Sequence, residues 1–158
     1  MPEWSNGTDS RSVGLVPTKV RILSLALKMK IIDGKNATLG RLASYVAKQS
    51  LKGEEFAIVN CDQIIITGNR ESIKKDFLIK KGRVGSSQKG PKISKLNEKI
   101  VKRAIRGMLP DHRRGRGREA YKRIKCYVGI PKEFEDKGKI TAGKEKGIKF
   151  VKVKDILR

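Results

Sequence analysis

The sequence predicts a single α/β domain, and two features of its hydrophobic pattern support that prediction. Short apolar runs at 30–33, 56–59, 64–66 and 124–128 have the length of buried strands. Between them lie segments in which apolar residues recur at helical spacing. The chain has 158 residues, of which 37% are hydrophobic and 5% aromatic, so it can form one domain with a mainly aliphatic core.

The positive charge of the chain is large and unevenly placed. The formal net charge is +22, from 38 Lys+Arg against 16 Asp+Glu. Residues 74–125 hold 19 Lys+Arg against 4 Asp+Glu, so +15 of that charge falls in about a third of the sequence. Such an excess of positive charge gives information on the binding partner rather than on the fold. It is compatible with binding to a nucleic acid or a membrane surface, or with adaptation to a highly charged solvent. Its concentration in one region favours a nucleic-acid binder, because a binding footprint is localised.

The first strand and helix are expected at 30–33 and 39–51. Thr38 is the candidate N-cap, and apolar residues recur on one face of the helix. Arg41 and Lys48 fall on the opposite face. We therefore expect this helix to pack its aliphatic side on a sheet and to turn its basic side outward.

The middle of the chain allows two arrangements. The apolar runs 56–59 and 64–66 are separated by too few residues for a parallel crossover, so they form either one kinked edge or neighbouring strands of mixed direction. A helix is expected at about 70–79. Residues 80–92 combine glycine, serine and cations with almost no core-forming residues, which predicts a long loop that is mobile alone and ordered by RNA.

The stretch 103–129 organises the rest of the domain. An amphipathic helix is expected at 95–109, and Pro110 stops it. A turn rich in arginine and glycine follows, and after it a short helix at 119–123 and a strand at 124–128. The turn has no apolar surface to bury, and its guanidinium groups suit phosphate because each presents a planar fork of donors.

Cations on the outer faces of these helices and in the glycine-spaced loops are the candidate RNA contacts. Groups in such positions contact phosphate and sugar and recognise shape, whereas the stacked aromatics of a sheet-based RNA binder are missing. The predicted contact residues are Arg41, Lys48, Lys80, Lys81, Arg83, Lys89, Lys92, Lys99, Lys102, Arg103, Arg106, Arg113, Arg114, Arg116, Arg118, Lys122 and Arg123.

The sequence shows no catalytic or metal-binding pattern. His112 is the one histidine and lies in a cationic turn, while the carboxylates have no metal-like spacing. Cys61 and Cys126 lie singly in apolar strand contexts, so we expect small buried hydrophobes rather than a zinc site or a disulfide framework. No apolar run approaches the roughly 18 residues of a membrane span, so no membrane partner is expected.

Four motifs in collinear order, over roughly 31–134, resemble the ribosomal protein L-thirteen family of the large ribosomal subunit. They are LGRLAS at 39–44, VN…ITGN at 59–69, GMLP at 107–110 with GR at 117–118, and KCYVG at 125–129. The sequence YVGIPKEF at 127–134 is similar to the archaeal and eukaryotic branch.

The resemblance implies a three-layer α/β/α domain with a central, mostly parallel sheet of about four strands, plus basic loops and terminal extensions. It implies a structural constituent of the large ribosomal subunit, in the cytoplasmic ribosome, that binds large-subunit ribosomal RNA, meets neighbouring ribosomal proteins and supports early assembly. On that view the protein is no enzyme and needs no cofactor or small-molecule substrate. The sequence leaves open a second role as an RNA-binding regulator away from the ribosome.

The two ends are interpreted as extensions of a domain at 29–134. Residues 1–28, polar and predicted disordered over 1–14, are either a misassigned extension before a natural start at Met29 or a genuine tail that threads into RNA. Residues 135–158 form a basic C-terminal extension, which we expect to be irregular at 136–147 and extended at 148–153.

A chain that begins at Met29 is accordingly expected to fold and to enter ribosomes normally. Thermal unfolding of that truncated protein should remain a single cooperative transition, because the removed segment lacks a domain-like pattern. Loss of cooperativity would show that residues 1–28 belong to the core.

Overall fold

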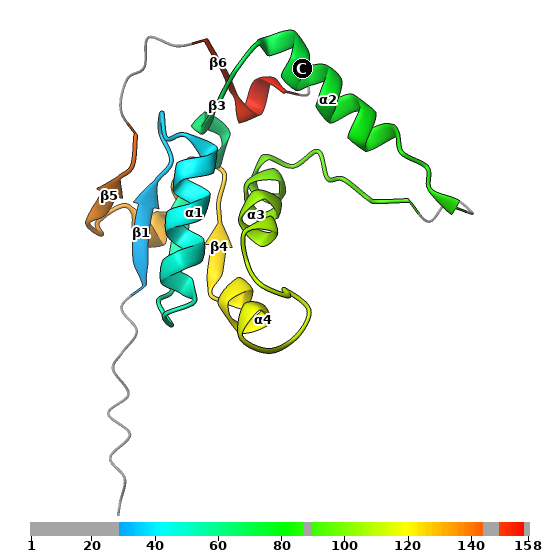
Figure 1. Cartoon of the computed structure of the whole chain (residues 1–158). Coiled ribbons are helices and arrows are strands. Elements are labelled where there is room, and N and C mark those ends of the chain that lie inside the picture. Colours follow the sequence, from blue (N-terminus) through cyan, green and yellow to red (C-terminus); the bar gives the residue numbers. More distant parts are fainter. Residues whose placement is uncertain (1–28, 87–89, 144–148, 157–158) are drawn as a thin grey trace, which may run out of the picture.

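The computed structural model describes residues 29–86, 90–143 and 149–156. Its centre is a four-stranded sheet in the order β4-β2-β1-β5 (Figure 1). Every neighbouring pair is parallel, and the strands are β1 (Lys30–Asp33), β2 (Phe56–Val59), β4 (Ile124–Cys126) and β5 (Lys139–Thr141). The α/β class and the four-stranded, mostly parallel sheet are therefore confirmed.

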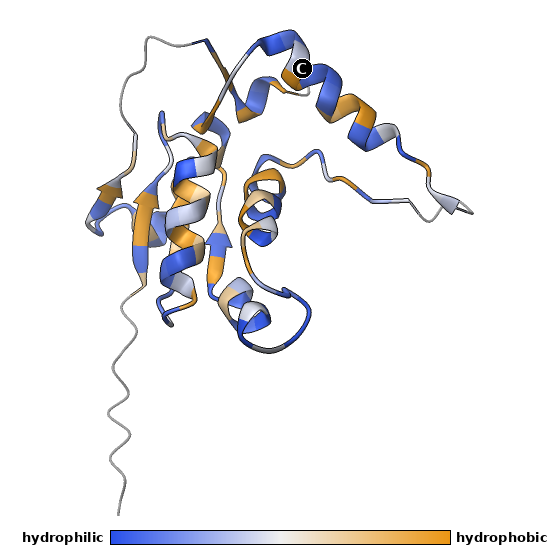
Figure 2. Cartoon of the chain, viewed as in Figure 1, coloured by the Kyte–Doolittle hydropathy of each residue, from blue (hydrophilic) through white to orange (hydrophobic). Residues whose placement is uncertain are grey.

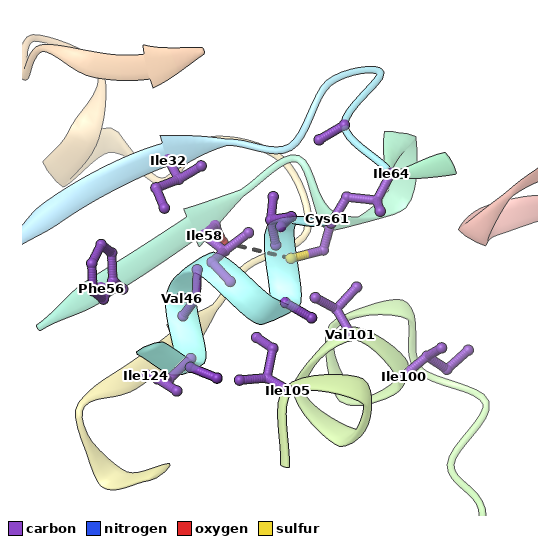
Figure 3. Close-up of a cluster of buried hydrophobic side chains, with 14 of the residues drawn as sticks. Ile32, Val46, Phe56, Ile58, Cys61, Ile64, Ile100, Val101, Ile105 and Ile124 are labelled. Carbon is purple, nitrogen blue, oxygen red and sulfur yellow. Dashed lines mark hydrogen bonds between the residues drawn. The ribbon is translucent and has the colours of Figure 1, made fainter. Parts of the chain in front are cut away.

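Alternation along the strands divides their apolar side chains between two faces. The larger hydrophobic cluster, on the helix side, takes Ile32, Phe56, Ile58 and Ile124 (Figure 3). A smaller cluster on the other side takes Ile31, Ala57 and Val59. Successive side chains of a strand point to opposite faces, so these short strands supply both clusters.

The helices cover one face of the sheet. The chain forms α1 (Leu39–Ser50), α3 (Asn97–Gly107) and α4 (Gly115–Lys122). The first two pack side by side, and their apolar stripes meet the sheet (Figures 1 and 3). The buried residues of α3 are Ile100, Val101 and Ile105, so the rest of that helix faces outward.

The opposite face of the sheet carries a thinner layer within the described residues. The 3₁₀ helix η3 (Lys132–Phe134) buries Phe134 in the smaller cluster. The Tyr127 and Phe134 rings meet edge to face with centroids 5.6 Å apart. An edge-to-face aromatic pair adds to the burial of its area, so this contact anchors the segment after β4.

Strand β3 (Ile65–Thr67) lies outside the main sheet and pairs antiparallel with β6 (Phe150–Lys152). The 3₁₀ helix η1 (Cys61–Gln63) turns the chain away after β2, and Asn60 enters it in the left-handed region at φ 55°. Both predicted arrangements, a kinked edge and neighbouring strands, are therefore wrong. The strand pairs instead with residues more than eighty positions later, and nothing local in the sequence indicates that partner.

Helix α2 (Arg70–Gly82) projects from the body, and residues 90–96 lead from the region of its far end towards α3 (Figure 1). The Asn69 side chain caps it by accepting a hydrogen bond from the Glu71 N–H at 3.2 Å. The helix runs past its predicted end at 79, because lysine is a good helix former and a cation is favoured at a helix C-terminus. We call α2 together with residues 83–86 and 90–96 the arm.

Other boundaries also differ from expectation. Helix α3 begins at Asn97 rather than 95, because the Ser94 hydroxyl accepts the Leu96 N–H at 3.2 Å and holds that segment extended. Helix α4 begins at Gly115 rather than 119, and β4 ends at Cys126 rather than 128. Strand β5 forms where an irregular segment was expected, because its backbone finds a partner in β1. Residues 144–148 lie outside the described part of the chain.

Replacing Ile105 with alanine tests the seam between α3 and the sheet. Ile105 is fully buried, so its truncation should lower the free energy of unfolding by about 2–5 kcal/mol. Ile79 on α2 is 60% exposed and is the matched control, whose truncation should cost within about 0.5 kcal/mol. Equal losses in urea unfolding would contradict the described packing.

Candidate nucleic-acid interface

The outward face of α3 forms one wall of a basic cavity of about 350 Å³. Five cations line it and no carboxylate does; the lining residues are Lys92, Ser94, Lys99, Lys102, Arg103, Arg106 and Tyr121. The Lys102 ammonium lies 4.9 Å from the centre of the Tyr121 ring, a cation–π contact that holds the lysine over α4. The cavity is therefore a cationic recess with one aromatic surface.

A second cavity, of about 300 Å³, lies between α3 and the edge strand β4. Its lining residues are Glu98, Lys99, Lys102, Lys125, Cys126 and Tyr127. Lys99 and Lys102 line both cavities, so the two are neighbours along one helix face. We call them together the α3 groove.

The arm carries a third basic recess, of about 380 Å³, where the end of α2 faces residues 90–93. Lys81, Arg83 and Lys92 are its cations, and Lys92 also lines the α3 groove. A hydrogen-bonding contact with the Lys95 side chain lowers the pKa of Lys81, with desolvation a smaller cause. Two lysines held this close repel each other, so an anion placed between them would be stabilised.

The arginine turn is divided between a loop and a helix. The Asp111 carboxylate accepts the Arg113 N–H at 3.1 Å and shapes the turn after Pro110. Arg116 and Arg118, predicted to lie in the turn, are instead in the first turn of α4. Figure 2 shows this loop as a hydrophilic stretch that bridges α3 and α4. No acidic residue occupies the first turn of α4, although helix N-termini favour negative charge.

Glycine at position 117 lets the turn close. Gly117 is buried, and a side chain there would collide with the carbonyl oxygen of Pro110. The helix α4 therefore packs directly on the turn that precedes it. This contact fixes where the exposed arginines stand relative to α3.

Carboxylate partners are scarce around these cations. The ion pairs among the described residues are Lys30–Glu54 at 2.7 Å and Glu119–Arg123 at 3.7 Å. Arg123 also donates to the Ser50 carbonyl oxygen at 3.3 Å, so it ties α4 to the end of α1. The remaining predicted cations of α3, α4 and the turn are in no ion pair within these ranges.

Several predicted residues lie away from the groove. Arg41, Lys48, Lys80 and Lys122 are exposed on their helices but line none of the three cavities. The exposed arginines of the turn and the start of α4, and Arg123 at the end of α4, line none of them either; the four exposed ones are Arg113, Arg114, Arg116 and Arg118. Lys89 lies outside the described residues. Sequence reasoning missed Lys125 and Tyr121, although the alternation of Ile124 and Lys125 along a strand could have indicated an outward lysine.

The described residues contain no group of three or more side chains suited to a metal ion. The Asp33 carboxylate accepts the Lys35 N–H at 3.0 Å and the Asn60 amide at 2.9 Å, so it shapes the end of β1. His112 packs edge to face with Tyr121, with ring centres 6.4 Å apart. Among the helices the structure describes, none has the length and apolar character to cross a membrane.

The fold and the surface define a class, a small α/β protein with a strongly cationic helix face. Residues 27–133 match the family described as Ribosomal protein L13, and the chain belongs to that family. The family consists of ribosomal proteins, so the protein is not an enzyme.

Three archaeal relatives carry the name Large ribosomal subunit protein uL13. Those of Methanopyrus kandleri and Methanosarcina barkeri are each 47% identical, over 67% and 72% of this chain. That of Methanocaldococcus jannaschii is 45% identical over 72% of this chain. The matched region covers 65% of the length of the Methanopyrus kandleri protein, which is just short of two thirds. It covers 80% of the Methanosarcina barkeri protein and 84% of the Methanocaldococcus jannaschii protein.

Replacing Gly117 with alanine should destabilise the protein and displace the arginine turn, because the new methyl group meets backbone that cannot move aside. A reduction of about 1–3 kcal/mol in the free energy of unfolding is expected for such overpacking. Gly107, with open space at its Cβ position, is the matched control, and alanine there should be neutral or stabilising. Similar melting temperatures for both variants would contradict the described packing of α4 on Pro110.

Proposed function

We propose that this protein is a structural constituent of the large ribosomal subunit that binds large-subunit ribosomal RNA. The observation that carries the proposal is the α3 groove, whose cations have no carboxylate partner among the described residues. A groove of unpaired cations suits a polyanion, and membership of the Ribosomal protein L13 family supports ribosomal RNA as that polyanion. The protein would accordingly act in the cytoplasmic ribosome beside neighbouring large-subunit proteins.

The groove suits phosphate and sugar more than base edges. Arginine forks and lysine ammonium groups contact phosphate oxygens, which fix position and carry no sequence information by themselves. The residues come from separate elements, among them the arm, α3, α4 and β4, so they recognise how an RNA is folded. Tyr121 and Tyr127 are aromatic side chains in the groove, and Lys102 occupies one side of the Tyr121 ring.

The proposal includes a part in early assembly. A small domain with a preformed core can bind an RNA fold before other proteins arrive, and its unpaired cations then neutralise phosphates that would repel one another. In this scheme the arm and the two ends, 1–28 and 135–158, are extensions of the binding domain at 29–134. Strand β5 shows that part of the C-terminal segment also completes the sheet.

Binding to a ribosomal RNA fragment should weaken steeply with salt. Each phosphate neutralised contributes roughly −0.7 to −0.9 to the slope of log affinity against log salt concentration, because bound counterions are released. Several phosphates are expected to be neutralised, so the slope should be steeper than about −2. A shallower slope in filter binding or fluorescence anisotropy would contradict a footprint of this size.

Replacing Arg114 and Arg116 together with alanine should weaken RNA binding and leave the fold intact. Both residues are exposed, so stability should change by within about 0.5 kcal/mol. The binding free energy should weaken by about 1–3 kcal/mol for each charge-assisted hydrogen bond to phosphate that is removed. Lysine at both positions should restore only part of it, because lysine keeps the charge but lacks the planar fork.

The matched control for that variant replaces Lys52 and Lys132, which are exposed, lie outside the arginine turn and line none of the three cavities. It removes the same net charge from elsewhere on the molecule. Equal weakening of affinity in the two double variants would show that only net charge matters. Wild-type affinity in the arginine variant would show that the turn is a solvated loop.

A further inference from the structure

Two cysteines that lie 65 positions apart in the sequence are neighbours in the fold. Cys61 opens η1 and Cys126 ends β4. The Cys61 N–H donates to the Tyr127 carbonyl oxygen at 3.1 Å, and the Tyr127 N–H donates to the Ile58 carbonyl oxygen at 2.8 Å. Ile58 is in turn the register partner of Cys126. Backbone hydrogen bonds on both sides thus hold the two residues together.

The two cysteines also share one apolar environment. The Cys61 thiol points at the Ile58 carbonyl oxygen, 3.6 Å away, inside the larger hydrophobic cluster (Figure 3). Cys126 packs against the same cluster. Hydrogen bonding with the Cys126 thiol, and then burial, raise the pKa of Cys61, which keeps that thiol protonated and unreactive towards reagents in solution.

The two thiols differ in access. Cys61 is fully buried, whereas Cys126 is partly exposed and lines the cavity of about 300 Å³ between α3 and β4. Lys99, Lys102 and Lys125 line the same cavity, so an anionic reagent is attracted to it. A reagent in this cavity can therefore meet Cys126 before the fully buried Cys61.

We propose that Cys126 and Cys61 form a thiol-exchange site for small anionic disulfides, with Cys126 as the attacking thiol and Cys61 as the resolving thiol. The Cys126 thiolate attacks one sulfur of the reagent, which forms a mixed disulfide and releases one thiolate. As the Cys61 sulfur attacks the Cys126 sulfur, the Cys61 proton passes to the departing group, which leaves as the second thiol. The protein loses two electrons and two protons, and the reagent gains the two electrons.

The product would be a disulfide between η1 and β4. It would tie the turn after β2 to the edge strand of the sheet, at the wall of the α3 groove. The two chain segments already share backbone hydrogen bonds, so the disulfide would join residues whose backbones are neighbours. A single cysteine in either position could form a mixed adduct but could not complete the exchange.

The test uses the full chain, free of RNA, and 5,5′-dithiobis(2-nitrobenzoate), a dianionic aromatic disulfide whose released thiolate is coloured. Wild-type protein should release two equivalents of thiolate in two steps and retain no adduct by mass spectrometry. Its mass should fall by that of two hydrogen atoms. The Cys61→Ser variant should release one equivalent and keep one adduct, and the Cys126→Ser variant should react many-fold more slowly.

Urea unfolding of both serine variants shows whether they retain the fold, and denatured samples give the total thiol count. The mass of the oxidised wild-type protein also tests the proposal without any variant. An unadducted, doubly oxidised monomer with a Cys61–Cys126 linkage in a peptide map supports the proposal. Two stable adducts, one stable adduct on Cys126, or no reaction in the folded protein would each overturn it.

Discussion

The packing of α3 against α1 and against the sheet is the interaction that the basic surface of the domain requires. Ile100, Val101 and Ile105 are the apolar side of that helix, and every one of them is buried. Once they are committed to the core, the 3.6-residue period leaves the lysines and arginines of the same helix no position except outside. The burial of the apolar side of α3 therefore places the cations of that helix on the protein surface.

That arrangement concentrates like charges on a small surface, which works against the folded state. Lys99, Lys102, Arg103 and Arg106 lie within two turns of one another, and the arm brings Lys81 close to Lys95. Ion pairs among the described residues relieve little of this repulsion, because one joins Lys30 to Glu54 at the start of β1 and the other lies within α4. A bound polyanion would remove the repulsion and add attraction. The folded protein is therefore more stable when a polyanion is bound to this surface than when the surface is free.

The sequence predicted the parts of the fold that depend on local pattern. The strand at 30–33 and the helix from Leu39 were predictable because their apolar residues follow one period and have clear boundaries. The pairing of β3 with β6 was not, since strand partners distant in sequence leave no local mark. The start of α4 was missed because glycine normally argues against a helix, whereas here Gly117 is the residue that lets the helix approach Pro110.

The sequence was sufficient to predict many of the cations of the candidate site, but not the cavities that they line. Charge counting located the basic region, and helical periodicity placed Lys99 and Arg106 on one face. Neither charge counting nor periodicity could show that Tyr121 lines the same cavity. They also could not show that Arg123 binds the Ser50 carbonyl oxygen and so joins α4 to α1. Those facts depend on how separate elements meet. The contact between Cys61 and Cys126 is a further example, because their strand contexts gave no reason to pair them.

RNA bound at the α3 face, rather than by the charge of the whole chain, should shield the lysines of that face. Acetylation footprinting measures this shielding, because the reactivity of each lysine can be compared in the free protein and in its complex with a ribosomal RNA fragment. Lys99 and Lys102 should lose reactivity in the complex, while exposed Lys132 and Lys137 on the far side of the sheet should keep theirs. Protection of all four to the same degree, or of the far side alone, would contradict the account.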